Sequence, residues 1–116
     1  MKTLFVSGSD TDVGKTWVVG ALAALLASRG FSVQVVKPVE TGVTDPANSD
    51  VQGVLNNCSN ALVSGYTLFS YEKPIAPVAA AEAEGQTLNL STIVERVVEL
   101  PKADWRIVEG AGSLAS

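Results

Sequence analysis

The sequence predicts an α/β fold in which a mostly parallel sheet is flanked by helices. Short apolar segments rich in β-branched residues alternate with helical patterns, and glycine- or proline-containing loops follow the strands. The first strand, helix and second strand fit within about 35 residues, which is the length of a βαβ unit and indicates parallel pairing. With 116 residues, 47% of them hydrophobic, the chain can build one small core.

The first predicted unit occupies residues 3–36. Residues 3–7 are apolar and β-branched and predict a buried strand. Residues 15–29 predict a helix whose apolar side chains cover much of its circumference, so we expect it to be largely buried, with Gly30 as its C-cap. Residues 32–36 predict a second strand that ends at Lys37-Pro38.

The rest of the chain predicts, in order, a polar loop at 39–49, a short helix at 50–57, a strand or loop at 66–71, and helices at 79–84 and 90–100. Asn48 or Ser49 would cap the first of these helices, and Asn89 or Ser91 the last. Residues 105–108 predict another strand, and its mainly apolar character places it inside the sheet.

Composition excludes several classes of site. Eight basic and 12 acidic residues give a net charge of −4, which argues against a nucleic-acid surface. There is no histidine, so histidine bases and histidine metal ligands are excluded. Cys58 is the single cysteine and forms no intrachain disulfide. No segment resembles a signal peptide or a membrane span, and we expect a cytoplasmic protein without a membrane partner.

The strongest motif is the segment Gly8–Thr16, which reads Gly-Ser-Asp-Thr-Asp-Val-Gly-Lys-Thr. It follows a predicted strand and opens a predicted helix, the context of a phosphate-binding P-loop. Gly14 allows close approach of the backbone, Lys15 supplies a charge to the β- and γ-phosphates, and Thr16 offers a hydroxyl to magnesium. A chance match of these residue types occurs at about one position in 10⁵.

Two features of this loop leave alternatives open. Five residues separate Gly8 from Gly14, where the common motif has four. The carboxylates of Asp10 and Asp12 would repel a phosphate unless they face a cation. They could reach magnesium-bound water or a substrate amine, or they could be turn and capping residues.

Further polar residues follow the other strands, whose carboxyl ends should meet in one crevice. Lys37 could stabilise charge during phosphoryl transfer, or it could be a solvated lysine at a strand end. Glu109 has the position of a Walker-B-type magnesium ligand. Asp50 is a second candidate ligand or a helix N-terminal acid, and Asp45 is a rival for the same role. Thr41 offers a hydroxyl that by itself indicates only a turn.

Four motifs together resemble the dethiobiotin synthetases, in order and in spacing: Gly8–Thr16, Lys37–Gly42, Ser49-Asp50 and Val108–Gly112. The resemblance implies a P-loop NTPase-like fold and an ATP- and magnesium-dependent ligase. It also implies the substrates 7,8-diaminononanoate and carbon dioxide, joined through a phosphorylated carbamate, and a homodimer with substrate near the subunit interface.

The resemblance also assigns residue roles. Lys15 and Lys37 would stabilise the transferring phosphoryl group and the carbamate. Thr16, Asp50 and Glu109 would hold magnesium, and Thr11, Lys37 and Thr41 would face the substrate. The implied ATP-binding residues are Asp12, Val13, Gly14, Lys15, Thr16, Trp17, Asp50, Glu109, Gly110, Ala111 and Gly112. Judged without the resemblance, Trp17, Trp105 and Cys58 are interpreted as packing residues.

The resemblance has departures as well. The family runs to about twice this length, so residues 1–116 are expected to be the N-terminal part of a single, apparently truncated domain. Asp12 stands where the family often has Glu or Gly, and Ser113 replaces a frequent Gly. The remaining half would supply recognition of the nucleotide base.

Three other interpretations keep a similar loop. One is an amidoligase of the cobyrinic-acid type. Another is an ATP switch of the ParA or MinD type, which usually carries a lysine four residues before Gly14, where this chain has Asp10. The last is a chain that no longer acts.

Overall fold

The computed structural model describes residues 1–7 and 12–110, with side chains from residue 14 onward in the second range. Its elements, in chain order, are β1 (Lys2–Val6), α1 (Asp12–Ser28), β2 (Val33–Thr41), a short 3₁₀ turn (Pro46–Asn48), α2 (Asp50–Asn57), β3 (Val63–Tyr71), α3 (Pro77–Ala83), α4 (Leu90–Glu99) and β4 (Trp105–Glu109). Among the helices in these ranges, none has the length and apolar character needed to cross a membrane.

The four described strands form one parallel sheet in the order β1-β4-β2-β3. Strand β4 lies between β1 and β2, so the prediction that residues 105–108 lie inside the sheet is confirmed. The register pairs Val6 with Glu109 and Val36 with Val108. The carboxyl ends of β1 and β4 therefore lie side by side, next to the middle of β2.

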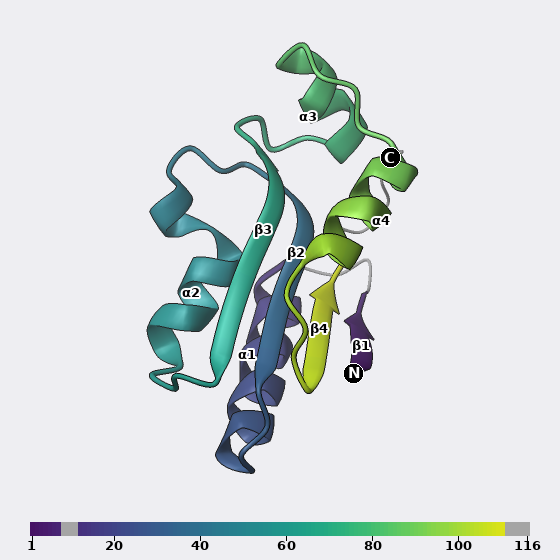
Figure 1. Ribbon diagram of the computed structural model, residues 1–116. Helices are drawn as coiled ribbons and strands as arrows, with labels where there is room; N and C mark the ends of the chain where they lie inside the picture. Colours follow the sequence, from purple (N-terminus) through teal and green to yellow (C-terminus); the bar gives the residue numbers. More distant parts are fainter. Residues whose placement is uncertain (8–11, 111–116) are drawn as a thin grey trace.

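Helices cover both faces of this sheet (Figure 1). One face packs against α1 and α2 through a core that includes Val19, Val35, Val54 and Ile107. The residue after Ile107, Val108, points to the opposite face, where it lines a cavity beneath α4. A second core packs the carboxyl ends of β2 and β3 against α3 and α4. These layers confirm the predicted α/β class.

Two predictions of burial are wrong. Strand β1 is an edge strand, because it pairs only with β4 among the described residues, and the Phe5 side chain is 76% exposed. Helix α1 buries one stripe, formed by Val19, Ala23 and Ala27, whereas Trp17 is 73% exposed. An apolar sequence pattern does not distinguish an edge strand from a central one, or a one-sided helix from an enclosed one.

Strand β2 does not end at Lys37-Pro38 but continues to Thr41, so the first residues of the predicted polar loop belong to the sheet. Pairing with β4 ends at Val36, whereas pairing with β3 continues to Thr41. At Pro38 the strand is therefore paired on one side only, where the missing N–H of a proline is tolerated. As a result, Lys37 is a strand residue held in place on the sheet.

The predicted helix termini agree closely with the structure. Gly30 adopts a φ of 87°, and its N–H donates to the carbonyl of Ala27, as expected of a C-cap. Ser49 caps α2 by accepting the N–H of Gln52 at 3.2 Å. Asn89 caps α4 by accepting the N–H of Thr92 at 2.9 Å. The ambiguous segment at 66–71 is part of β3.

Candidate functional site

The first turn of α1 is tied to the carboxyl end of β4 by two side-chain hydrogen bonds. The Thr16 hydroxyl donates to Glu109 Oε1 at 3.1 Å. The Lys15 ammonium donates to the carbonyl of Gly110 at 3.2 Å. Both contacts join residues more than 90 positions apart in the sequence. The convergence predicted for the P-loop and Glu109 is confirmed.

The Glu109 side chain is 1% exposed and lies among both basic and acidic groups. Burial raises the pKa of Glu109 above its ordinary value, because the ionised carboxylate loses its hydration. The charges of Lys37 and Lys15 and the hydrogen bond from Thr16 oppose this rise, whereas the charge of Asp50 adds to it. Burial is therefore the largest single influence on the pKa of this carboxylate.

Lys37 is a buried member of the same cluster, with 2% of its surface exposed, so it is not a solvated strand-end lysine. Its ammonium forms an ion pair with the Asp50 carboxylate at the start of α2. Burial lowers the pKa of Lys37, but the hydrogen bond to Asp50 and the charges of Glu109 and Glu40 outweigh burial and raise the pKa above its ordinary value. Lys37 thus carries a fixed positive charge.

Glu40 is a site residue that was not predicted from the sequence. Its side chain is 6% exposed, and its two carboxylate oxygens accept the backbone N–H of Asp50 at 3.0 and 3.2 Å. The signal that could have revealed it is an acidic residue inside a strand whose neighbours are apolar or buried. That signal is lost when the strand is taken to end at Pro38.

In the part of the chain that the structure describes, cavities lie on both faces of the sheet. The first, of about 550 Å³, lies between α1 and α2, and its lining includes Thr16, Trp17, Ser49, Asp50 and Cys58. Thr16 and Asp50 therefore face one cavity, and Trp17 borders it as an exposed residue, which contradicts the packing role predicted for Trp17. Trp105 does pack, against the ring of Phe31.

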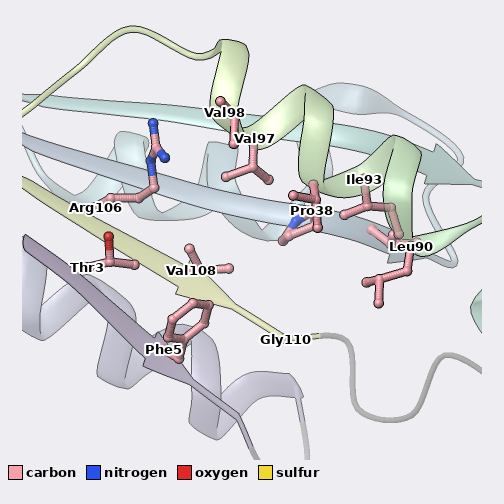
Figure 2. A pocket seen from close by; sticks show the side chains of 12 residues that line it. Thr3, Phe5, Pro38, Leu90, Ile93, Val97, Val98, Arg106, Val108 and Gly110 are labelled. Carbon is pink, nitrogen blue, oxygen red and sulfur yellow. The ribbon is translucent and has the colours of Figure 1, made fainter.

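The second cavity, of about 440 Å³, lies on the opposite face between α4 and the sheet (Figure 2). Its walls are mostly apolar and include Phe5, Ile93, Val98 and Val108. The charged side chain on its wall is Arg106, whose Nε donates to Gln34 at 2.6 Å. None of the carboxylates described above lines this cavity.

A sequence model described as an AAA domain matches residues 2–116. The chain belongs to this AAA domain family. The P-loop NTPase-like fold expected from the motifs is therefore confirmed. Family membership also agrees with the position of Lys15 and Thr16 at the first turn of the helix that follows the first strand.

The resemblance to dethiobiotin synthetases is also confirmed by individual relatives. The chain is 44% identical over 117 residues to the ATP-dependent dethiobiotin synthetase BioD of Parafrankia sp., an alignment that covers 98% of this chain and 48% of the relative. It is 38% identical to that of Bacillus licheniformis (99% and 50% covered) and 41% identical to that of Rhodococcus jostii (98% and 49% covered). The chain thus spans about half the length of these relatives.

The oxygen-bearing side chains near Glu109 match one common way in which proteins bind magnesium. No group of three or more His, Cys, Asp or Glu side chains gathers into a metal cage within the ranges that the structure describes. What the described part offers is a hydroxyl, Thr16, beside the Glu109 carboxylate, with Asp50 on the same cavity as Thr16. Magnesium is commonly held by one or two carboxylates together with phosphate oxygens and waters, and this donor set fits that mode.

Asp45 is separate from this group. Its carboxylate accepts the N–H of Ala47 and caps the 3₁₀ turn, so the structure favours Asp50 over Asp45. Thr41 ends β2 beside Tyr71, four residues beyond Lys37 and so roughly 13 Å further along the strand. The structure does not bring Thr41 into the cluster.

Several predicted residues lie outside the described part of the chain. Asp10, Thr11, Ala111 and Gly112 fall in ranges that the structure does not describe. Asp12 and Val13 begin α1, but their side chains are not described. Their roles at the phosphate site, and the contact of Thr11 with substrate, stay predictions.

Proposed function

We propose that this chain supplies the phosphate- and magnesium-binding part of an ATP-dependent dethiobiotin synthetase, which closes a ureido ring on 7,8-diaminononanoate. The observation that carries the proposal is the hydrogen bond between Thr16 and Glu109. It places a P-loop hydroxyl against a buried strand-end carboxylate, in a chain that is similar over nearly its whole length to dethiobiotin synthetases.

Lys15 and the first turn of α1 would bind the phosphates of ATP. The N-terminal N–H groups of a helix and the positive end of its dipole favour an anion. The Lys15 ammonium already lies at this end, where it donates to the Gly110 carbonyl. We expect a bound phosphate oxygen to replace that carbonyl as its acceptor, because an ion pair with phosphate is the stronger interaction.

Thr16, Asp50 and Glu109 would hold magnesium together with ATP. When bound, the ion supplies positive charge that neutralises the phosphates. Burial already disfavours the ionised form of Glu109, and a cation would stabilise that form. The ion pair with Lys37 keeps the Asp50 carboxylate close to the same cavity.

Lys37 would act on the reacting groups. One substrate amine adds to carbon dioxide and loses a proton, giving a carbamate. A carbamate oxygen then takes the γ-phosphoryl group of ATP, and ADP leaves. The second amine attacks the carbamoyl carbon, the bond from that carbon to the phosphate oxygen breaks, and inorganic phosphate and a proton are released. A lysine that stays charged while buried can stabilise the negative charge of both the carbamate and the transferring group.

On this proposal, residues 1–116 are the N-terminal part of one domain, and the complete protein is a cytoplasmic homodimer with substrate near the subunit interface. The support is that the chain aligns with about half of each dethiobiotin synthetase relative. Recognition of the nucleotide base would come from the other half.

The test is ATP turnover by a full-length version that contains this chain. Fast hydrolysis should require both 7,8-diaminononanoate and bicarbonate, and dethiobiotin should be detected by mass spectrometry. Hydrolysis that ignores the diamine and responds to a partner protein or DNA would instead support an ATP switch. Amide formation on a different acid with an added amine donor would support the amidoligase.

A further inference from the structure

The start of α2 is attached to β2 at two points. The Asp50 carboxylate pairs with the Lys37 ammonium, and the Asp50 backbone N–H donates to the Glu40 carboxylate. Both partners belong to β2, three residues apart. Asp50 is thus held through its side chain and through its main chain by one rigid strand.

The Glu40 contact is additional to the ordinary cap of α2. Ser49 already accepts the N–H of Gln52, which is the usual N-cap interaction. Glu40 satisfies a different orphan donor of the first turn, and its charge faces the positive end of the helix dipole. A carboxylate that is 94% removed from solvent is costly unless it is hydrogen-bonded, and the Asp50 N–H provides two such contacts.

We propose that Glu40 is a positioning residue, which anchors the first residue of α2 to β2 and so sets the place of the Asp50 carboxylate relative to Glu109. The anchoring itself rests on the hydrogen bonds alone. Its consequence for magnesium and ATP rests on the proposed function.

The need for such an anchor follows from the connection between β2 and α2. Between Thr41 and Asp50, the only regular structure that the chain forms is the short 3₁₀ turn Pro46–Asn48, which is exposed. Without Glu40, the polar attachment of the start of α2 to β2 would rest on the Lys37 ion pair, beside the apolar packing of Val51 in the core. A long lysine side chain has several rotamers. A misplacement of about 1 Å in a reacting group costs on the order of 100-fold in rate.

The experiment compares full-length proteins carrying Glu40→Ala, Glu40→Gln or the control Glu84→Gln. Glu84 is matched because its carboxylate also accepts a distant backbone N–H, that of Glu72 at 2.8 Å, but on an exposed surface. The first readout is hydrogen exchange of the Asp50 amide by NMR, which needs no activity. The second is the magnesium concentration that half-saturates ATP turnover, with kcat and the KM of the diamine measured separately.

We expect Glu40→Ala to accelerate exchange of the Asp50 amide by about 10-fold or more, since the bond to a charged acceptor is lost. The magnesium requirement should rise and kcat should fall, while the KM of the diamine stays near wild type. Glu40→Gln keeps an oxygen acceptor and should restore most of both properties. Glu84→Gln should match wild type throughout.

A wild-type exchange rate of the Asp50 amide in Glu40→Ala would show that Glu40 does not anchor α2. The same conclusion would follow if Glu84→Gln changed the exchange rate as much as Glu40→Ala does. Faster exchange with an unchanged magnesium requirement would overturn the positioning role. If Glu40→Ala does not fold, Glu40→Asp is measured in its place. The aspartate side chain is one methylene shorter, so its carboxylate should lie further from the Asp50 N–H. Wild-type exchange and magnesium dependence in Glu40→Asp would then reject the proposal. Normal anchoring in a protein that makes no dethiobiotin would reject only the proposed function.

Discussion

Thr16 and Glu109 are 93 residues apart in sequence and share a hydrogen bond of 3.1 Å. The contact joins the N-terminal part of α1 to the end of β4, one of the two inner strands of the sheet. Around it lie two lysines and a second carboxylate, which come from α1, β2 and α2.

Lys15→Ala should weaken MgATP binding by at least about 100-fold, because it removes the charge-assisted hydrogen bond that the buried Lys15 side chain would make to phosphate. Isothermal titration calorimetry on the full-length protein measures the affinity. Lys102→Ala, which removes an exposed lysine near the start of β4, is the control and should bind ATP normally. Equal MgATP affinities for Lys15→Ala and wild type would contradict a phosphate-binding role for Lys15.

Glu109→Gln should have opposite effects on stability and on activity. The raised pKa of Glu109 shows that burial penalises its ionised form, so the neutral glutamine should raise the melting temperature of the ligand-free protein at pH 7 to 8. Turnover should fall by about 100-fold or more, because a carboxylate at the proposed magnesium site is lost.

The stability difference between Glu109→Gln and wild type should depend on pH with a definite sign. A folded-state pKa above the ordinary value of 4.5 means that protonation of Glu109 stabilises the native wild type below that pH. This stability is lost as the pH rises through the raised pKa. The two proteins should therefore melt alike below pH 4.5 and diverge above it, as calorimetry over this range would show. A constant difference at all pH values would contradict this account.

Lys37→Ala should destabilise the protein by about 3 kcal/mol, because it leaves the Asp50 carboxylate without its buried partner. Urea denaturation of Lys37→Ala, Asp50→Ala and the double variant gives the coupling energy, and the double variant should lose less than the sum of the two single variants. The pKa of Lys37 in the folded protein is raised above its ordinary value of 10.5. The stability that the Lys37 charge contributes should therefore be fully present below pH 10.5 and be lost as the pH rises through the raised pKa. If the stability losses of the two single variants add up to that of the double variant, the ion pair contributes no coupling energy.

Gly65→Ala should cost about 1–3 kcal/mol, because an added Cβ would lie 2.5 Å from Val51 Cγ1 and 3.2 Å from Leu55 Cδ1. Both neighbours belong to α2, so the helix that carries Asp50 must move, and the magnesium requirement for turnover should rise. Gly53→Ala lies on the same helix with nothing within 4 Å of the added methyl. It should stabilise the protein by about 0.5–1 kcal/mol. Denaturant titration distinguishes the two, and equal stabilities would contradict the contact.

Residues 1–116 expressed alone should be poorly soluble or molten and should form no dethiobiotin. Large apolar side chains around the cavity beneath α4 are exposed, including Phe5, Leu90 and Val98, and such a surface favours self-association. Light scattering, dye binding and thermal unfolding beside the full-length version would test this. A monomeric fragment that unfolds cooperatively and turns over at the full-length rate would show that these residues are a complete enzyme.

Much of the site could be predicted because its signals are local. The glycines and the Lys15-Thr16 pair stand between an apolar strand and a helix, so the P-loop pattern can be recognised from residues that are neighbours along the chain. Glu109 was found because it ends the strand that precedes Gly110, and Asp50 because it follows the Ser49 cap. Glu40 was missed because its role depends on a helix that begins ten residues later.

By itself, the sequence determined the α/β class, the strand–helix context of Lys15 and Thr16 and the Gly30 cap, and it narrowed the cap of α2 and the cap of α4 to two residues each, because these signals lie close together along the chain. Only the tertiary structure decided that Ser49 and Asn89 are the caps, that β1 lies at the edge of the sheet formed by the described strands, that Lys37 pairs with Asp50, and that Glu40 is buried. The physical reason is that strand order and burial arise from segments far apart in the chain. An apolar strand has the same local pattern at the edge of a sheet as at its centre, and a charged residue shows its partner only when the two segments meet.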